Sequence, residues 1–106
     1  MEHDSDDILN EIVNRLVAGL QPETVILFGS HATGTATEHS DIDMLVVVKD
    51  SIEPRYRRSR KAYRCLRGIT IPTDVLVLTR QEMAEAATVP SSLVARVLQE
   101  GKVVYG

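Results

Sequence analysis

The chain has 106 residues, of which 43% are hydrophobic and 25% are charged, with a formal net charge of -3 at pH 7. This balance is typical of a folded globular domain and excludes disordered, collagen-like and low-complexity classes. The single cysteine excludes an internal disulfide, and no apolar stretch is long enough for a membrane span. We therefore expect one domain over residues 1–106, without contact with a membrane and located in the cytoplasm.

Helices and strands are predicted to alternate along the chain, from hydrophobic periodicity and from glycine and proline breaks. In chain order we expect a helix over 5–20, a strand over 24–28, a short helical turn and loop over 30–40, a strand over 41–48, a helix over 53–66, a strand over 73–79, helices over 80–87 and 91–100, and a strand over 102–105. This order predicts an α/β or α+β fold with a small mixed sheet flanked by helices.

The helix over 53–66 is strongly basic, because residues 55–67 hold seven of the twelve lysines and arginines. Its narrow apolar side is predicted to consist of Tyr56, Ser59, Tyr63 and Leu66. We interpret the basic residues as a solvated face, and next as a contact for an acidic partner or for a triphosphate. A nucleic-acid surface is disfavoured, since aromatic residues make up 4% of the chain and the chain is acidic overall.

Three aspartates stand at the starts of two predicted strands. Asp41 and Asp43 open the strand DIDMLVVV, and Asp74 opens the strand TDVLVLT. Side chains two residues apart on a strand share a face, so Asp41 and Asp43 are expected to point together. Neighbouring carboxylates repel unless a cation lies between them, and an all-oxygen ligand set favours magnesium or manganese over zinc.

An isolated Asp-x-Asp is more often a capped turn beside a solvated strand end, and Asp74 alone would be a strand-entry cap. The preceding strand changes this interpretation because it ends at Gly29 and Ser30. A glycine lets the backbone approach a phosphate, and the serine offers a hydroxyl. The combination predicts a site for a phosphate-bearing ligand and a metal. His31 and His39 are interpreted as exposed loop residues.

The motif FGSHATGTATEHSDIDMLVVV, followed by PTDVLVLT, resembles the minimal nucleotidyltransferases of the DNA polymerase beta superfamily. The resemblance extends over about residues 5–105. It implies a polymerase-beta-like fold and two magnesium ions held by Asp41, Asp43 and Asp74, which would also be the catalytic residues. It further implies that Gly29 and Ser30 hold the phosphates of ATP and that Ser40 supports this nucleotide-binding loop.

The same resemblance implies a partner, because these small domains are encoded beside HEPN-type toxins in toxin–antitoxin pairs. The expected activity is that of a protein adenylyltransferase: magnesium-dependent transfer of AMP from ATP to a hydroxyl, that of a tyrosine, on the HEPN toxin. The acceptor would then arrive on the partner. The first helix or the last strand could pack against another chain, so an oligomer with the partner is left open.

Two alternatives stay open at this point. Family members often carry arginine where this chain has Thr33, so one phosphate contact is absent or replaced, and the chain could be an antitoxin that neutralises its toxin by binding alone. A transferase that modifies small molecules would need an acceptor pocket and ranks last. The sequence leaves the nucleotide, the acceptor residue and the oligomeric state undetermined.

Overall fold

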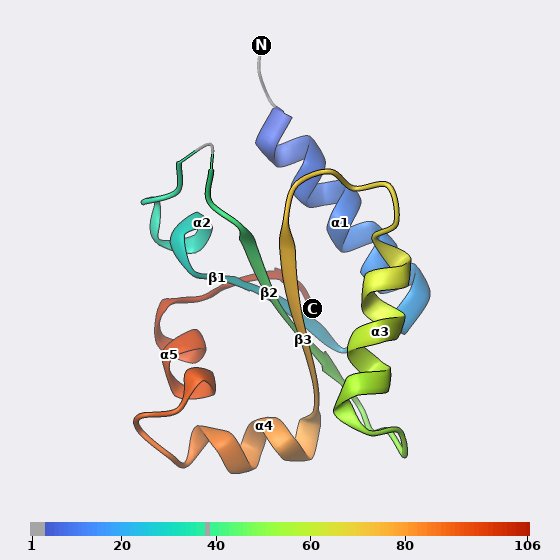
Figure 1. Ribbon diagram of the computed structural model, residues 1–106. Coiled ribbons are helices and arrows are strands. Elements are labelled where there is room, and N and C mark those ends of the chain that lie inside the picture. The colour runs from blue at the N-terminus through green and yellow to red at the C-terminus, as the bar shows by residue number, and fades with distance from the viewer. Residues whose placement is uncertain (1–3, 38) are drawn as a thin grey trace.

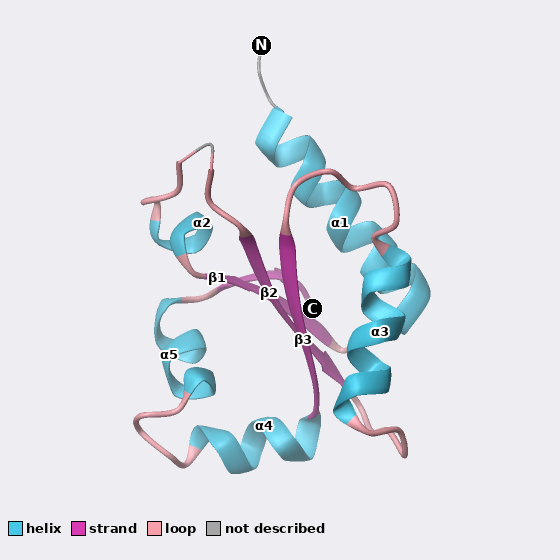
Figure 2. Cartoon of the chain, viewed as in Figure 1, coloured by secondary structure: helices cyan, strands magenta, loops and turns pink. Residues whose placement is uncertain are grey.

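Four strands form one mixed sheet in the computed structural model, which describes residues 4–37 and 39–106, with side chains from residue 7 onward (Figures 1 and 2). In chain order the elements are α1 (Asp4–Leu20), β1 (Thr24–Phe28), α2 (Ser30–Thr33), β2 (Ile42–Val48), α3 (Arg55–Cys65), β3 (Thr73–Thr79), α4 (Arg80–Ala87), α5 (Leu93–Glu100) and β4 (Lys102–Tyr105). The predicted fold class, a small mixed sheet flanked by helices, is confirmed.

The strand order across the sheet is β3-β2-β1-β4. β1 pairs antiparallel with both β2 and β4, whereas β2 pairs parallel with β3. The strand predicted over 41–48 begins at Ile42, so Asp41 lies one residue outside it. The other three strands have the predicted bounds.

The sheet separates two hydrophobic clusters because side chains alternate between the faces of each strand. One cluster joins α1 and α3 to the sheet face formed by Val25, Leu27, Ile42, Met44, Val46, Val75 and Val77. The other joins α4 and α5 to the opposite face, which presents Ile26, Phe28, Leu45, Leu76 and Leu78. Figure 1 shows the two helix pairs on opposite sides of the sheet.

β3 is an edge strand, and α3 covers its open side. The hydroxyl of Tyr63 accepts a hydrogen bond from the backbone nitrogen of Val75, and Arg58 donates from Nη1 to the backbone oxygen of Val77. These bonds satisfy backbone groups that an edge strand otherwise offers to another chain.

The predicted apolar side of the basic helix is wrong for its two tyrosines, whereas Leu66 is buried as predicted. Tyr56 and Tyr63 are 60% and 45% exposed, whereas the buried residues of this helix are Arg58 and Ala62. Arg58 is therefore no part of a solvated face. Its burial is stabilised by a carboxylate from another element, which helical periodicity cannot reveal.

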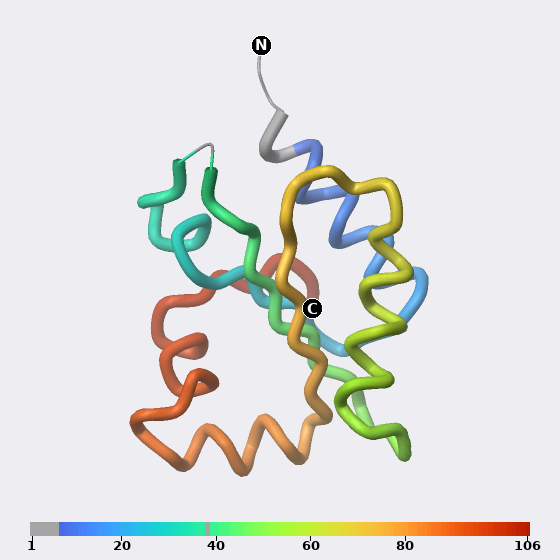
Figure 3. The backbone as a smooth tube through the Cα atoms, viewed as in Figure 1, coloured from blue at the N-terminus to red at the C-terminus, as the bar shows by residue number. Residues whose placement is uncertain are grey.

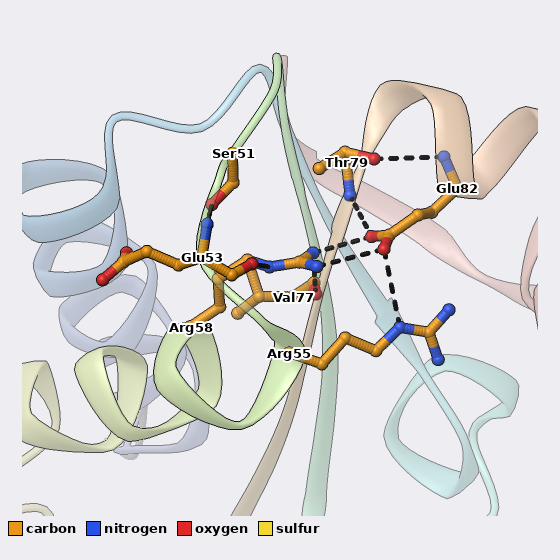
Figure 4. A network of polar contacts seen from close by, with 7 residues as sticks. All are labelled: Ser51, Glu53, Arg55, Arg58, Val77, Thr79 and Glu82. Atoms are coloured by element: carbon orange, nitrogen blue, oxygen red, sulfur yellow. Dashed lines mark hydrogen bonds and ion pairs between the residues drawn. The ribbon is translucent and has the colours of Figure 1, made fainter.

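Arg58 and Glu82 form a bidentate ion pair between α3 and α4 (Figure 4). The two nitrogen–oxygen distances are 2.7 and 3.0 Å. Glu82 also accepts from the backbone nitrogen of Thr79, while the Thr79 side chain accepts from the backbone nitrogen of Glu82, which makes a capping box at the start of α4. One carboxylate thus joins α3, the end of β3 and α4.

No helix within residues 4–37 and 39–106 is long and apolar enough to cross a membrane.

Replacing Arg58 should destabilise the fold much more than replacing its exposed neighbour. Arg58→Gln leaves Glu82 without its main cation and the Val77 carbonyl without its donor, so we expect a loss of about 3 kcal/mol of unfolding free energy. Arg57→Gln, one position away on the exposed face, should change it by less than about 0.5 kcal/mol. Urea denaturation of the three proteins measures this, and equal midpoints would contradict the role assigned to Arg58.

The same pair predicts how stability depends on pH. The hydrogen bonds from Arg58 lower the pKa of Glu82 to about 2. A carboxylate with a depressed folded-state pKa contributes stability above its unfolded-state pKa and loses it as the pH falls through the folded value. The wild type should therefore lose its advantage over Glu82→Gln, about 3 kcal/mol, between about pH 4.5 and pH 2. A constant difference across that range, measured by urea denaturation, would refute this.

Candidate functional site

The aspartates and the glycine-serine pair meet at one end of the sheet, where β1 ends and β2 and β3 begin. In the strand register, Asp43 lies opposite Phe28 of β1 on one side and opposite Asp74 of β3 on the other. The backbone nitrogen of Ile42 also donates to the carbonyl of Pro72, which joins the starts of β2 and β3. The loops that lead into these two strands lie at the same end of the sheet (Figure 3).

Asp43 and Asp74 share the sheet face that α4 and α5 cover. Leu45 and Leu76 pack in the cluster on that face, and each lies two residues after one of the aspartates. Since side chains two residues apart on a strand share a face, both carboxylates point to the side of α5.

The carboxyl of Asp43 lies in an unfavourable electrostatic environment. Burial raises its pKa first, and the neighbouring charges of Asp74 and Asp41 raise it further, while His31 opposes the shift. A raised pKa means that the charged form is destabilised here. A positively charged ligand would relieve this cost.

Asp41 and Asp74 are the exposed members of the predicted set, and Asp41 precedes β2 rather than lying within it. The charges of Asp41 and Asp74 both contribute to the raised pKa of Asp43, so both carboxylates lie near it. Among the described side chains, no group of three or more His, Cys, Asp or Glu is arranged as a complete metal site. The structure thus brings Asp43 and Asp74 together and leaves Asp41 at the rim.

Gly29 is the tightest point of the site. Its φ of 75° and ψ of -155° belong to a region that only glycine adopts readily. A Cβ atom at this position would also collide with Oδ2 of Asp43. The glycine is therefore required both by its own backbone and by the approach of the Asp43 carboxylate.

Ser30 is the first residue of α2 and not its N-cap, which is Gly29. The side chain of Thr33 returns to the loop, where its hydroxyl lies 3.4 Å from the Gly29 carbonyl oxygen and 3.0 Å from the Thr35 hydroxyl. Thr33 therefore extends no group toward a ligand in the way that an arginine would.

Ser40 is used inside the loop before β2. Its hydroxyl accepts from the backbone nitrogen of Thr37 at 2.9 Å, and its carbonyl oxygen lies 3.3 Å from Nε2 of His31. The interpretation of His31 as an exposed loop residue is wrong, because it is half-buried and bonds across the loop. His39 is exposed, as expected.

A pocket of about 360 Å³ opens between this end of the sheet and α5. Its lining comes from the end of β1, the α2 loop, β2 and α5, and consists of Phe28, Gly29, Ser30, Thr33, Thr35, Asp43, Leu93, Arg96, Val97 and Glu100. The α5 residues were missed by the sequence analysis. The available signal was Arg96, the one basic residue of the predicted helix over 91–100.

Residues 10–106 match the family described as Polymerase beta, Nucleotidyltransferase. Two proteins of Methanocaldococcus jannaschii are similar to parts of the chain, and both are named "Putative protein adenylyltransferase". MJ1305 is 46% identical over 45% of this chain and 30% of its own length, and MJ0141 is 34% identical over 52% of this chain and 54% of its own. The matches thus span less than two thirds of either relative.

Two solved structures have a similar fold. A crystal structure of a "putative nucleotidyltransferase" from Sulfolobus solfataricus superposes with a TM-score of 0.65 at 25% identity, covering 92% of this chain and 76% of that one. A toxin–antitoxin crystal structure with AMP-PNP superposes with a TM-score of 0.60 at 28% identity, covering 92% and 72%.

Two glycines allow a matched test of the site geometry. Gly34 also has a positive φ, of 81°, but nothing lies within 4 Å of a Cβ built there. Gly34→Ala should therefore cost only the backbone strain, about 1 kcal/mol. Gly29→Ala adds the collision with Asp43 and a less accessible ψ, so we expect a loss of at least about 2 kcal/mol in urea denaturation. Equal losses would show that Asp43 does not press against Gly29.

Proposed function

Because the chain belongs to the Polymerase beta nucleotidyltransferase family, we propose that it transfers AMP from ATP to a hydroxyl of a HEPN-type toxin and so acts as the antitoxin. The observation that carries this proposal is the pairing of Asp43 with Asp74 beside Gly29, at the mouth of a pocket. The adenylyltransferase names of two relatives and the toxin–antitoxin neighbour support the reaction and the kind of partner.

The nucleotide would enter the pocket between the α2 loop and α5. The AMP-PNP in the toxin–antitoxin neighbour supports ATP as the donor. Gly29 would allow the triphosphate to approach the backbone, and the hydroxyl of Ser30, for which no partner is found within the described residues, would donate to it. Ser40 would act indirectly, by holding the loop closed through Thr37 and His31.

Asp43, Asp74 and Asp41 would hold two magnesium ions. The fit rests on the raised pKa of Asp43, since a divalent cation would offset the repulsion that raises it, and on a ligand set made of carboxylate oxygens. When bound, the ions would neutralise the departing pyrophosphate and lower the pKa of the attacking hydroxyl.

The proposed reaction is a single displacement at phosphorus. The acceptor oxygen forms a bond to the α-phosphorus of ATP, the bond from that phosphorus to the bridging oxygen breaks, and pyrophosphate leaves with the electron pair. The exposed carboxylate of Asp74 would receive the proton of the acceptor hydroxyl. A tyrosine is a suitable acceptor, because its unperturbed pKa of about 10 is far lower than that of an aliphatic hydroxyl.

The intact mass of the partner tests the proposal. The purified HEPN-type partner is incubated with ATP, magnesium and the wild type, Asp43→Asn or Asp50→Asn. We expect the partner to gain whole AMP units with the wild type, and the rate to fall by at least about 100-fold with Asp43→Asn, since a metal-binding charge at the site is removed. Asp50 is exposed and follows β2 at the far end, so Asp50→Asn should retain the wild-type rate.

The outcomes separate the two candidate antitoxin activities. A partner that stays unmodified while it still forms a stable complex and loses its toxicity would replace the enzyme with a binding antitoxin. An unchanged rate in Asp43→Asn would exclude the proposed role of that carboxylate. Unfolding curves for both variants, matching or exceeding that of the wild type in midpoint, establish that a loss of rate does not come from a loss of fold.

A further inference from the structure

α5 contributes one positively charged side chain to the pocket. Leu93, Arg96, Val97 and Glu100 all line it, and their spacing of three and four residues places them on one side of the helix. Of the ten lining residues, Arg96 is the one cation, whereas Asp43 and Glu100 are anions. A polyanionic ligand in this pocket therefore meets a single guanidinium.

The position of Arg96 is fixed by its helix. The neighbouring Val97 is 1% exposed and packs in the cluster on this face of the sheet. At the start of α5, Ser92 caps the helix by accepting from the backbone nitrogen of Ala95, and its hydroxyl donates to the carbonyl of Ala86 in α4. The backbone that carries Arg96 is thus held in place by the sheet and by α4 before any ligand binds.

The guanidinium of Arg96 is exposed and has no partner among the described residues. Within residues 4–37 and 39–106, no hydrogen bond or ion pair is made by its side chain, although Glu100 lies one turn further along the same helix. By contrast, the buried Arg58 uses its nitrogens on Glu82, Val77 and Glu53. Arg96 therefore contributes no polar contact that stabilises the fold.

We propose that Arg96 binds the β- and γ-phosphates of the nucleotide and so makes the pocket select triphosphates over monophosphates. The inference rests on the proposed function and adds a binding residue to it from α5. Arginine suits this role because its planar group donates two parallel hydrogen bonds to phosphate oxygens. The pocket residues of the adjacent α2 segment, Gly29, Ser30, Thr33 and Thr35, offer hydroxyls and backbone, and Thr33 bonds back onto the loop.

The inference is tested by calorimetric binding of AMP-PNP and of AMP, each with magnesium, to the full chain. The variants are Arg96→Gln, Arg96→Lys and, as a control, Arg57→Gln on the distant basic helix. We expect Arg96→Gln to weaken AMP-PNP binding by about tenfold or more, the loss of one charge-assisted phosphate contact, and AMP binding by less than about threefold. Arg96→Lys should restore part of the loss, and Arg57→Gln should leave both affinities within about twofold.

Three other outcomes would contradict the role of Arg96 or the proposed function. If the wild type binds AMP-PNP and Arg96→Gln binds it equally well, the inference fails while the proposed function stands. If AMP and AMP-PNP weaken by the same factor, Arg96 does not read the outer phosphates. If the wild type binds neither nucleotide, the proposed function fails and the inference with it. As a control, an unfolding midpoint of Arg96→Gln equal to that of the wild type would establish that the variant is folded.

Discussion

The register of β2 against both of its neighbours is the constraint on which the site depends. The antiparallel pairing with β1 places Asp43 beside the turn at Gly29, and the parallel pairing with β3 places it beside Asp74. Because side chains alternate along a strand, a slip of one residue would turn Asp43 into the cluster under α1 and α3 and expose Met44 instead. Burial of the apolar strand residues thus fixes the position of the carboxylates.

The two faces of the sheet serve different purposes. The face under α1 and α3 is packed along the whole length of β2, at Ile42, Met44 and Val46. The opposite face is packed only from Leu45 onward, so its first part stays open beside α5. At the other end of β3, Arg58 and Glu82 hold α3 and α4 to the strand. The contacts of Arg58 and Glu82 stabilise the fold at that end of the sheet. The repulsion between the aspartates at the other end can therefore be tolerated.

The charges of the site are unbalanced in the protein alone. Burial and the charges of Asp74 and Asp41 disfavour the charged form of Asp43, while Arg96 on α5 makes no hydrogen bond or ion pair within the described residues. The repulsion at Asp43 costs stability, and Arg96 contributes none. In the proposed function, a bound nucleotide and its cations would make both groups favourable. This distribution is consistent with an enzyme of the family to which the chain belongs, and with the nucleotide-bound toxin–antitoxin structure to which its fold is similar.

The sequence alone determined the strands and the turn at Gly29 and Ser30, because β-branched apolar runs and glycine or proline breaks are local signals. It also put Asp43 and Asp74 at strand starts, but only the parallel register made them neighbours. The tertiary structure decided the buried face of α3, where Arg58 depends on Glu82, 24 residues away, and not on helical periodicity. It likewise brought Arg96 to the pocket and His31 to Ser40. These contacts depend on how the chain folds back on itself, within the loop for His31 and between separate elements for Arg58 and Arg96, and a local sequence pattern holds no information about them.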